Sequence, residues 1–176
     1  MKDMPGEKSF MPKPERPTVL YHASRNVGIE AFEPRALKVR DRNEGPRVFA
    51  TPSRAVASMF LIESDDSWVK SGVEDGVPYM VISDESRYRA LDTGGVVYSL
   101  PAITFENDPD KGLGEFEWTS AEPVVPNEKE SVPSALVDML AHGVQVYFVN
   151  TETFHAIEQS DDYGWSIRHN LTPYKA

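Results

Sequence analysis

The chain has no cysteine among its 176 residues. This absence excludes disulfides, a thiolate nucleophile and every cysteine-based zinc site. No apolar run approaches the roughly 18 residues that a membrane span needs, so we expect no membrane association. The first ten residues, MKDMPGEKSF, have no apolar core and therefore do not resemble a signal peptide. Together these absences predict a cytoplasmic protein.

Several common catalytic and cofactor motifs are also missing. The chain has no P-loop, no GxSxG elbow and no HExxH pair, and the GLGEFE segment at 112–117 lacks the third glycine of a dinucleotide-binding turn. None of the four histidines has metal-ligand spacing to another: His22, His142, His155 and His169. We therefore expect no metal site.

The balance of charge is acidic overall and basic in one segment. The formal net charge of −10 repels nucleic acid phosphates, which argues against a nucleic acid partner. Residues 35–54 are the exception, with six cations, two carboxylates and a net charge of +4. The six cations are Arg35, Lys38, Arg40, Arg42, Arg47 and Arg54.

Local patterns predict an α+β fold in one domain, residues 18–160, between an arm and a tail. The proline-rich residues 1–17 predict an extended or disordered arm, and the polar residues 161–176 a loosely held tail. Strands are expected at 18–23, 47–50, 78–83, 95–100, 115–120, 122–125 and 144–149. Helices are expected from the cap Ser53 to Ile62, at 131–143 and at 151–159, with loops at 24–46, 63–76 and 106–114. Because helices and strands do not alternate regularly, the pattern argues against a doubly wound parallel sheet.

One pattern in the first 60 residues carries a family resemblance. A strand ends in YHAS at 21–24, and a second strand, VFATP at 48–52, leads into a serine-capped helix. This order resembles the catalytic domain of poly(ADP-ribose) polymerases, in which an H-G-S motif precedes a tyrosine-phenylalanine-alanine strand and a helix. The resemblance covers residues 19–60 and implies an ADP-ribosyltransferase-like fold: a split core of mixed or antiparallel strands with a few flanking helices.

The resemblance also implies an NAD site. His22 matches the histidine that binds the adenosine ribose, and Ser24 matches the residue that binds the nicotinamide carboxamide. The backbone of Ala23 matches the glycine that holds the same amide. Phe60, or Met59 before it, lies where the family has a tyrosine that stacks on nicotinamide. The alanine and the lost tyrosine hydroxyl are departures from the family pattern.

The family's catalytic glutamate begins a later strand, before an aromatic residue. The candidates are Glu117, which precedes Trp118, and Glu115, which precedes Phe116; Glu117 is favoured. A fixed carboxylate is needed because cleavage of the nicotinamide–ribose bond passes through an oxocarbenium-like state. With His22, these two glutamates are the candidate catalytic residues.

Arg40 and Arg42 belong to the basic segment and are candidates for the pyrophosphate of NAD, on a loop suited to act as a lid. Ordinary structural roles stay open: His22 as a hydrogen-bonded strand residue, Phe60 as part of the core, Glu117 facing solvent, and the basic segment as a solvated loop.

Three functions follow from these expectations. The leading hypothesis is an NAD-dependent ADP-ribosyltransferase with an unknown acceptor, expected to be a protein. A second is an RNA 2′-phosphotransferase of the same fold, which the acidic net charge disfavours. A third is a non-catalytic binding module, or a phage or plasmid accessory protein, that keeps the fold without the chemistry.

Overall fold

The computed structural model describes residues 12–36 and 40–176, which form a mixed α+β structure. These residues contain five α-helices, one 3-10 helix and nine strands, which make three small open sheets. The strands are β1 Val19–Ser24, β2 Val48–Ala50, β3 Val69–Glu74, β4 Val77–Ile82, β5 Gly95–Pro101, β6 Phe105–Asn107, β7 Trp118–Ser120, β8 Glu128–Val132 and β9 Gln145–Phe148. The helices are α1 Arg54–Ser58, α2 Glu85–Leu91, α3 Ala135–Ala141, α4 Thr151–Glu158, α5 Trp165–His169 and the 3-10 helix η1 Gly114–Phe116.

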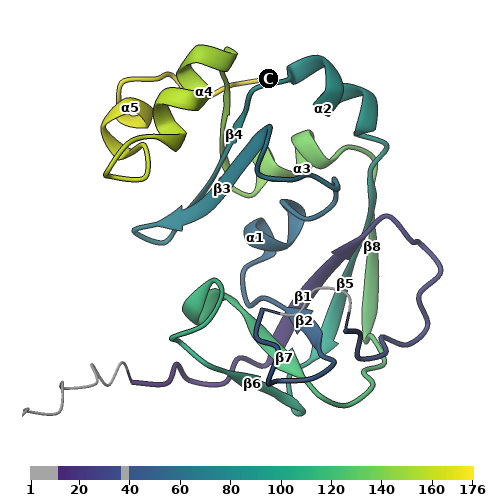
Figure 1. Cartoon of the computed structure of the whole chain (residues 1–176). Coiled ribbons are helices and arrows are strands. Elements are labelled where there is room, and N and C mark those ends of the chain that lie inside the picture. The colour runs from purple at the N-terminus through teal and green to yellow at the C-terminus, as the bar shows by residue number, and fades with distance from the viewer. Residues whose placement is uncertain (1–11, 37–39) are drawn as a thin grey trace, which may run out of the picture.

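The three sheets form two regions (Figure 1). The antiparallel sheets β1-β5-β8 and β2-β7-β6 lie at one end, and the mixed sheet β3-β4-β9 lies at the other with α4 and α5 beside it. Helix α1 lies between the two regions. Among the strands of the described residues, only β4 and β9 run parallel, and α3 directly precedes β9 in the chain.

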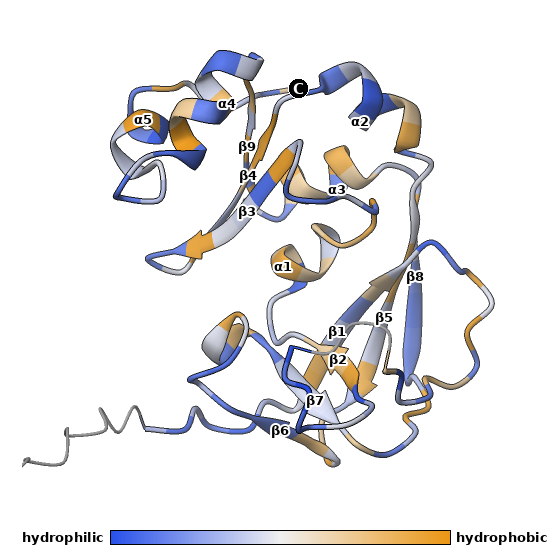
Figure 2. Ribbon diagram, viewed as in Figure 1, coloured by the Kyte–Doolittle hydropathy of each residue, from blue (hydrophilic) through white to orange (hydrophobic). Residues whose placement is uncertain are grey.

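Three buried apolar clusters lie around the sheets, and a ribbon coloured by hydropathy shows apolar residues in several strands and helices (Figure 2). One of them, with Val81, Tyr147, Phe154 and Ile157, lies between β4, β9 and α4. The larger cluster joins the first and third sheets, because it includes Ala23 and Val97 as well as Ile82 and Val146. A second cluster, which we call the small core, lies between β1-β5-β8 and β2-β7-β6. It contains Leu20, Phe32, Val48, Ala50, Val96, Tyr98, Leu100, Ala102, Phe105, Trp118 and Val124.

Most of the expected strands and helices are confirmed, several to within one residue. The strands expected at 18–23, 47–50, 78–83 and 95–100 correspond to β1, β2, β4 and β5. Ser53 caps α1 as expected, since its side chain accepts a hydrogen bond from the Val56 N–H. The helix ends at Ser58, earlier than the apolar spacing predicted.

The loop predicted at 63–76 is wrong in its second half, which is β3. Strands β3 and β4 form a hairpin whose two turn residues, Asp75 and Gly76, have φ of 49° and 77°. Positive φ at both positions is the type I′ geometry that favours Asp-Gly, so the sequence carried a hairpin signal that the acidic composition obscured.

Three other predicted boundaries are also corrected. The strand predicted at 115–120 begins only at Trp118, because Glu115 lies in η1. Of the strand predicted at 122–125, only Val124 pairs, in an isolated bridge to Phe32. The helix predicted from Ser131 begins at Ala135, because its cap is Ser134 and residues 128–132 form β8.

The segment after Ser160 is more ordered than a loosely held tail. It contains α5, whose Arg168 is buried, forms an ion pair with Glu74 and lies over the ring of Tyr79. The Tyr174 N–H donates to the carbonyl of Val146 in β9 at 2.7 Å. At the other end, residues 12–17 of the arm form no helix or strand. Within the described ranges, none of the helices has the length and apolar character to cross a membrane.

Candidate functional site

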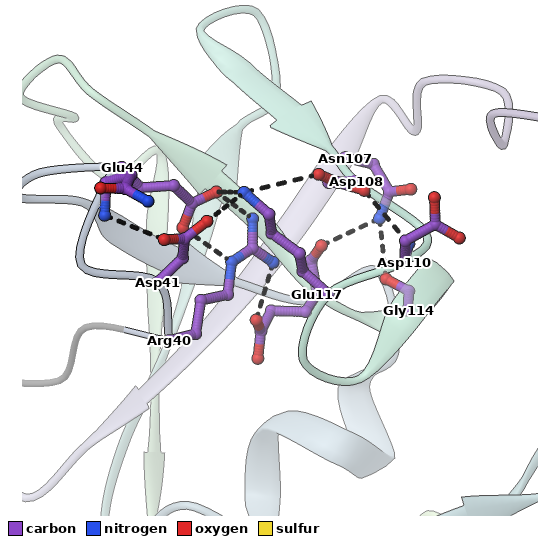
Figure 3. Close-up of polar contacts among 10 residues, drawn as sticks. Arg40, Asp41, Glu44, Asn107, Asp108, Asp110, Gly114 and Glu117 are labelled. Carbon is purple, nitrogen blue, oxygen red and sulfur yellow. Dashed lines mark hydrogen bonds and ion pairs between the residues drawn. The ribbon is translucent and has the colours of Figure 1, made fainter.

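The candidate site is built around an ion pair between the basic segment and the favoured glutamate. Arg40 Nη1 lies 2.8 Å from Glu117 Oε1, and the Arg40 Nε and Nη2 atoms donate to the two carboxylate oxygens of Glu44 at 3.0 and 2.9 Å (Figure 3). Lys111 completes the group with contacts to Asp41 at 2.8 Å, Glu44 at 3.4 Å and Asp108 at 3.6 Å. We call Arg40, Asp41, Glu44, Asp108, Lys111 and Glu117 the ion-pair cluster.

Two short turns bring these charges together. On the first, the Asn43 N–H donates to the side chain of Asp41 and the Glu44 N–H to its carbonyl. On the second, the Asp110 N–H donates to the side chain of Asp108, and Lys111 follows directly. A hydrogen bond from a backbone N–H to an aspartate side chain two residues earlier is typical of an Asx turn. Asp41 and Asp108 therefore stabilise the two turns.

Glu117 is held from its backbone as well as its carboxylate. The Asn107 Nδ2 group donates to the carbonyls of Gly114 and Glu117 at 2.8 and 2.9 Å. Gly112 has φ of 53°, and a Cβ there would lie 2.1 Å from Glu117 Oε1. Only glycine provides both the left-handed backbone and the space that the glutamate side chain occupies.

The cluster is partly shielded from water, which strengthens its charge pairing. The side chains of Arg40, Glu44 and Glu117 are 10%, 13% and 19% exposed. Hydrogen bonding to Glu44 and Glu117 raises the pKa of Arg40, while hydrogen bonding from Arg40 lowers the pKa of Glu44. Likewise Lys111 lowers the pKa of Asp41. Both acids therefore favour their charged form.

Strand register places Glu117 in a row with the first two strands. Tyr21 and Thr51 exchange backbone hydrogen bonds at 2.7 and 2.9 Å. The β2–β7 register ends with Ala50 opposite Trp118, and Thr51 and Glu117 are the next residues beyond this pair on the two segments. Directly opposite residues share a face of an antiparallel pair. We call this the Glu117 face, formed by Tyr21, Thr51 and Glu117 with their neighbours Ala23, Phe49 and Thr119.

Within the described residues, strands β1 and β2 make no backbone hydrogen bond beyond this row, and we call this unpaired stretch between them the gap. The Tyr21–Thr51 bridge is the one backbone pairing found between them in the described parts of the chain. Backbone N–H and C=O groups alternate between the two edges of a strand. Those of Ala23 therefore point to the same edge as those of Tyr21, towards the gap. The Phe49 carbonyl, which faces β1 across this gap, accepts a 2.6 Å hydrogen bond from His22 Nδ1. Because a carbonyl only accepts, Nδ1 must carry a proton.

The structure does not bring the His22 side chain and Glu117 onto one face. His22 alternates with Tyr21 and packs its ring 4.6 Å from that of Phe32, in the small core. Ser24 shares that orientation, and its hydroxyl accepts a hydrogen bond from the Asn26 N–H. Of the YHAS segment, therefore, Tyr21 and Ala23 share the face of Glu117.

The other aromatic and acidic candidates are dispersed. Phe60 is 56% exposed, whereas Met59 is buried in the larger cluster. Glu115 is exposed in η1, and its carbonyl accepts the Trp118 indole N–H at 3.1 Å. Glu117 is thus the candidate glutamate whose carboxylate is held in place by a charged partner.

The basic segment does not act as one positive patch. Arg54 makes a bidentate pair with Asp138 of α3 at 2.6 and 2.9 Å, and the backbones of Arg35 and Arg47 pair with each other. Arg42 is exposed, and Lys38 lies outside the described residues. Arg40 reaches the site, but two carboxylates occupy its donors.

A cavity of about 560 Å³ lies beside the cluster, a volume within the usual range of ligand sites. It includes Thr119 of the Glu117 face together with Arg40 and Glu44. Its charged lining is mixed: Lys13, Arg40, Arg47, Glu44, Glu106, Asp108, Asp110 and Glu122. Such a lining suits a small ligand with both polar and charged groups better than a polyanion.

Glu44, Lys111, Gly112 and Asn107 were not singled out from the sequence. Their roles depend on how the loops at 40–44 and 107–117 fold and meet, so residue type and spacing give no signal for them. The described residues contain no group of three side chains suited to hold a metal ion. The chain matches no protein-family model, no curated protein and no solved structure.

Proposed function

We propose that the protein is an ADP-ribosyltransferase-like enzyme that binds NAD and cleaves its nicotinamide–ribose bond, with Glu117 as the catalytic carboxylate. The observation that carries the proposal is the Tyr21–Thr51–Glu117 row beside the gap between β1 and β2. That row joins three segments that the family resemblance relates to NAD: YHAS, VFATP and the Glu-Trp step.

The backbone supports a binding mode for nicotinamide. Where β1 and β2 separate, Ala23 directs one donor and one acceptor to the same edge. A primary carboxamide offers the complementary acceptor and donor. We propose that the nicotinamide amide pairs there in the manner of a short β-strand, which leaves the ribose next along the face, towards Glu117.

The proposed reaction then needs one negative charge near the ribose. The bond between C1′ of the ribose and the nicotinamide nitrogen breaks, and its electron pair leaves with neutral nicotinamide. The positive charge that develops on the ribose is stabilised by the Glu117 carboxylate. A lone pair on the acceptor, or on water, forms the new bond to C1′, and its proton passes to solvent.

The RNA 2′-phosphotransferase alternative fits the cavity less well. Five carboxylates line it against three cations, and the whole chain has a net charge of −10. Both would repel a phosphorylated RNA. A protein acceptor has no such conflict.

A non-catalytic binding module is the second candidate, and specific observations favour it. Ala23 is buried, and in this structure Glu117 is already paired with Arg40. A domain that had lost transferase chemistry would retain such a neutralised carboxylate at no cost to its fold. Calorimetry with NAD separates the two candidates, because the module predicts no binding and the enzyme predicts saturable binding.

Nicotinamide release tests the enzyme directly. We expect the purified chain to release nicotinamide from NAD, and Glu117→Gln to reduce the rate at least about 100-fold, the usual effect of losing one preorganised electrostatic group. Glu115→Gln is the matched control, two residues away and exposed, and should retain the wild-type rate. Absence of release by the wild-type chain, with water and with several protein acceptors, would refute the enzyme proposal.

A further inference from the structure

We propose that Arg40 is the positioning residue for the Glu117 carboxylate, and that Glu44 and Lys111 anchor it. The inference rests on the proposed function for its catalytic consequence. Its structural part, that Arg40 fixes where the Glu117 carboxylate lies, can be tested without NAD. Arg40 is not proposed to contact the reacting atoms.

The donors of Arg40 are divided between two carboxylates. Nε and Nη2 fork onto both oxygens of Glu44, and Nη1 remains for Glu117 Oε1. A planar guanidinium presents these donors in fixed directions, so the fork on Glu44 sets where Nη1 points. Glu117 consequently has one oxygen bonded, and its Oε2 atom makes none of the hydrogen bonds found in the described ranges.

Arg40 is itself restrained from two sides. Glu44 is four residues away on the same loop, so their fork holds independently of Glu117. Lys111 on the opposite loop contacts Glu44 and Asp41, which ties the two loops together. The guanidinium also lies 5.9 Å from the centre of the Phe49 ring, within range of a favourable cation–π contact. Loss of the Glu117 contact alone would therefore leave Arg40 in place.

This arrangement suits a carboxylate that must stabilise a transient positive charge. A free glutamate side chain samples several rotamers, and only some would face the ribose. A carboxylate held by one oxygen presents the other in a constant direction, and misplacement by about 1 Å can cost about 100-fold in rate. No second cation takes this role, because Arg40 alone forms an ion pair with Glu117 in the described ranges.

Crystal structures of Arg40→Gln and Arg42→Gln test the positioning claim without any substrate. Arg42 is a matched control on the same loop, since it is exposed and forms none of the ion pairs found in the described ranges. We expect Glu117 to keep its position in Arg42→Gln and to lose its single conformation in Arg40→Gln. An unchanged Glu117 carboxylate in Arg40→Gln would overturn the inference.

Kinetics test its consequence for catalysis. We expect Arg40→Gln to lower kcat for nicotinamide release about 10- to 100-fold with little change in KM. Lys129→Gln is the kinetic control and should leave both unchanged, because Lys129 is exposed in β8 and forms none of the ion pairs found in the described ranges. Guanidinium ion added to Arg40→Ala should restore part of the lost rate, an effect that a merely structural role would not produce. Equal kcat values for Arg40→Gln and wild type would contradict the inference.

The two proposals fail in distinguishable ways. If the wild-type chain releases no nicotinamide but Glu117 becomes disordered in Arg40→Gln, the proposed function fails and the positioning role remains. If release occurs and Arg40→Gln changes neither the structure nor the rate, the positioning role alone is refuted.

Discussion

Gly112 and Glu117 fit together so closely that a Cβ on the glycine would overlap the carboxylate: it would lie 2.1 Å from Glu117 Oε1. Gly112 also has φ of 53°, which side chains of L-residues rarely adopt. The position of the candidate catalytic carboxylate thus depends on a glycine five residues earlier in the chain.

Gly112→Ala should displace Glu117 and weaken its contact with Arg40. The strained backbone should also lower the free energy of unfolding by about 1 kcal/mol. Chemical denaturation measures the stability, and a crystal structure of the variant shows the glutamate. Gly76→Ala is the control, because Gly76 has φ of 77° but nothing within 4 Å of its Cβ position. Equal displacement of Glu117 in both variants would contradict the steric explanation.

Arg54 should contribute to stability through its pair with Asp138, which joins α1 to α3. Both side chains are nearly buried, at 14% and 10% exposed, and Arg54→Ala would leave the aspartate without its partner. We expect a loss of about 2 to 3 kcal/mol in urea denaturation. Removal of the exposed Arg89 from its pair with Glu85 should change stability by less than about 0.5 kcal/mol. A similar small effect for Arg54→Ala would argue that solvent already screens its pair.

Asp92 should be needed for α3 to begin at Ala135. Its carboxylate accepts hydrogen bonds from the Ser134 hydroxyl and from the N–H groups of Ala135 and Leu136. Asp92→Ala removes all three and should destabilise the fold by about 1 to 2 kcal/mol, as losses of helix N-terminal acceptors do. Asp84→Ala, which removes the side-chain N-cap of α2, is the comparison variant. Denaturation of both variants measures what the N-terminal acceptor contributes at α3 and at α2. No loss in Asp92→Ala would contradict this capping role.

Acid should loosen the ion-pair cluster through Glu44. Arg40 lowers the pKa of this group in the folded state from its ordinary value of 4.5. A depressed folded-state pKa gives stability that is present above 4.5 and is lost as the pH falls through the folded value. Glu44→Gln should therefore flatten the fall of unfolding free energy below pH 4.5, measured by denaturation between about pH 2.5 and 6. An unchanged slope would show that the Arg40–Glu44 fork is absent in solution.

Much of the secondary structure could be predicted from local patterns, and Arg40 and Glu117 were candidates, whereas the contacts that join them could not be predicted. Ser53 and the apolar spacing after it correctly indicated α1. The Asp75-Gly76 dipeptide is a local signal for the turn of the β3–β4 hairpin. The Arg40–Glu117 contact spans 77 residues, and it depends on how two loops meet across a sheet. The order of residues along the chain does not indicate that these two loops lie together.

The sequence also did not indicate which side chains of β1 share a face with the glutamate. The family resemblance implies that His22 and Ser24 contact NAD, whereas alternation along β1 turns Tyr21 and Ala23 to the Glu117 face. The register between β1 and β2 depends on one bridge, Tyr21–Thr51, and a shift of one residue would exchange the two sets.

Titration of the labelled protein with NAD, followed by backbone amide NMR, tests the central claim most directly. If the gap between β1 and β2 holds the nicotinamide amide, the largest saturable shifts will occur at Ala23 and around Thr51 and Trp118. Small or no shifts in this region, or shifts confined to α4 and α5, would contradict the proposed NAD site.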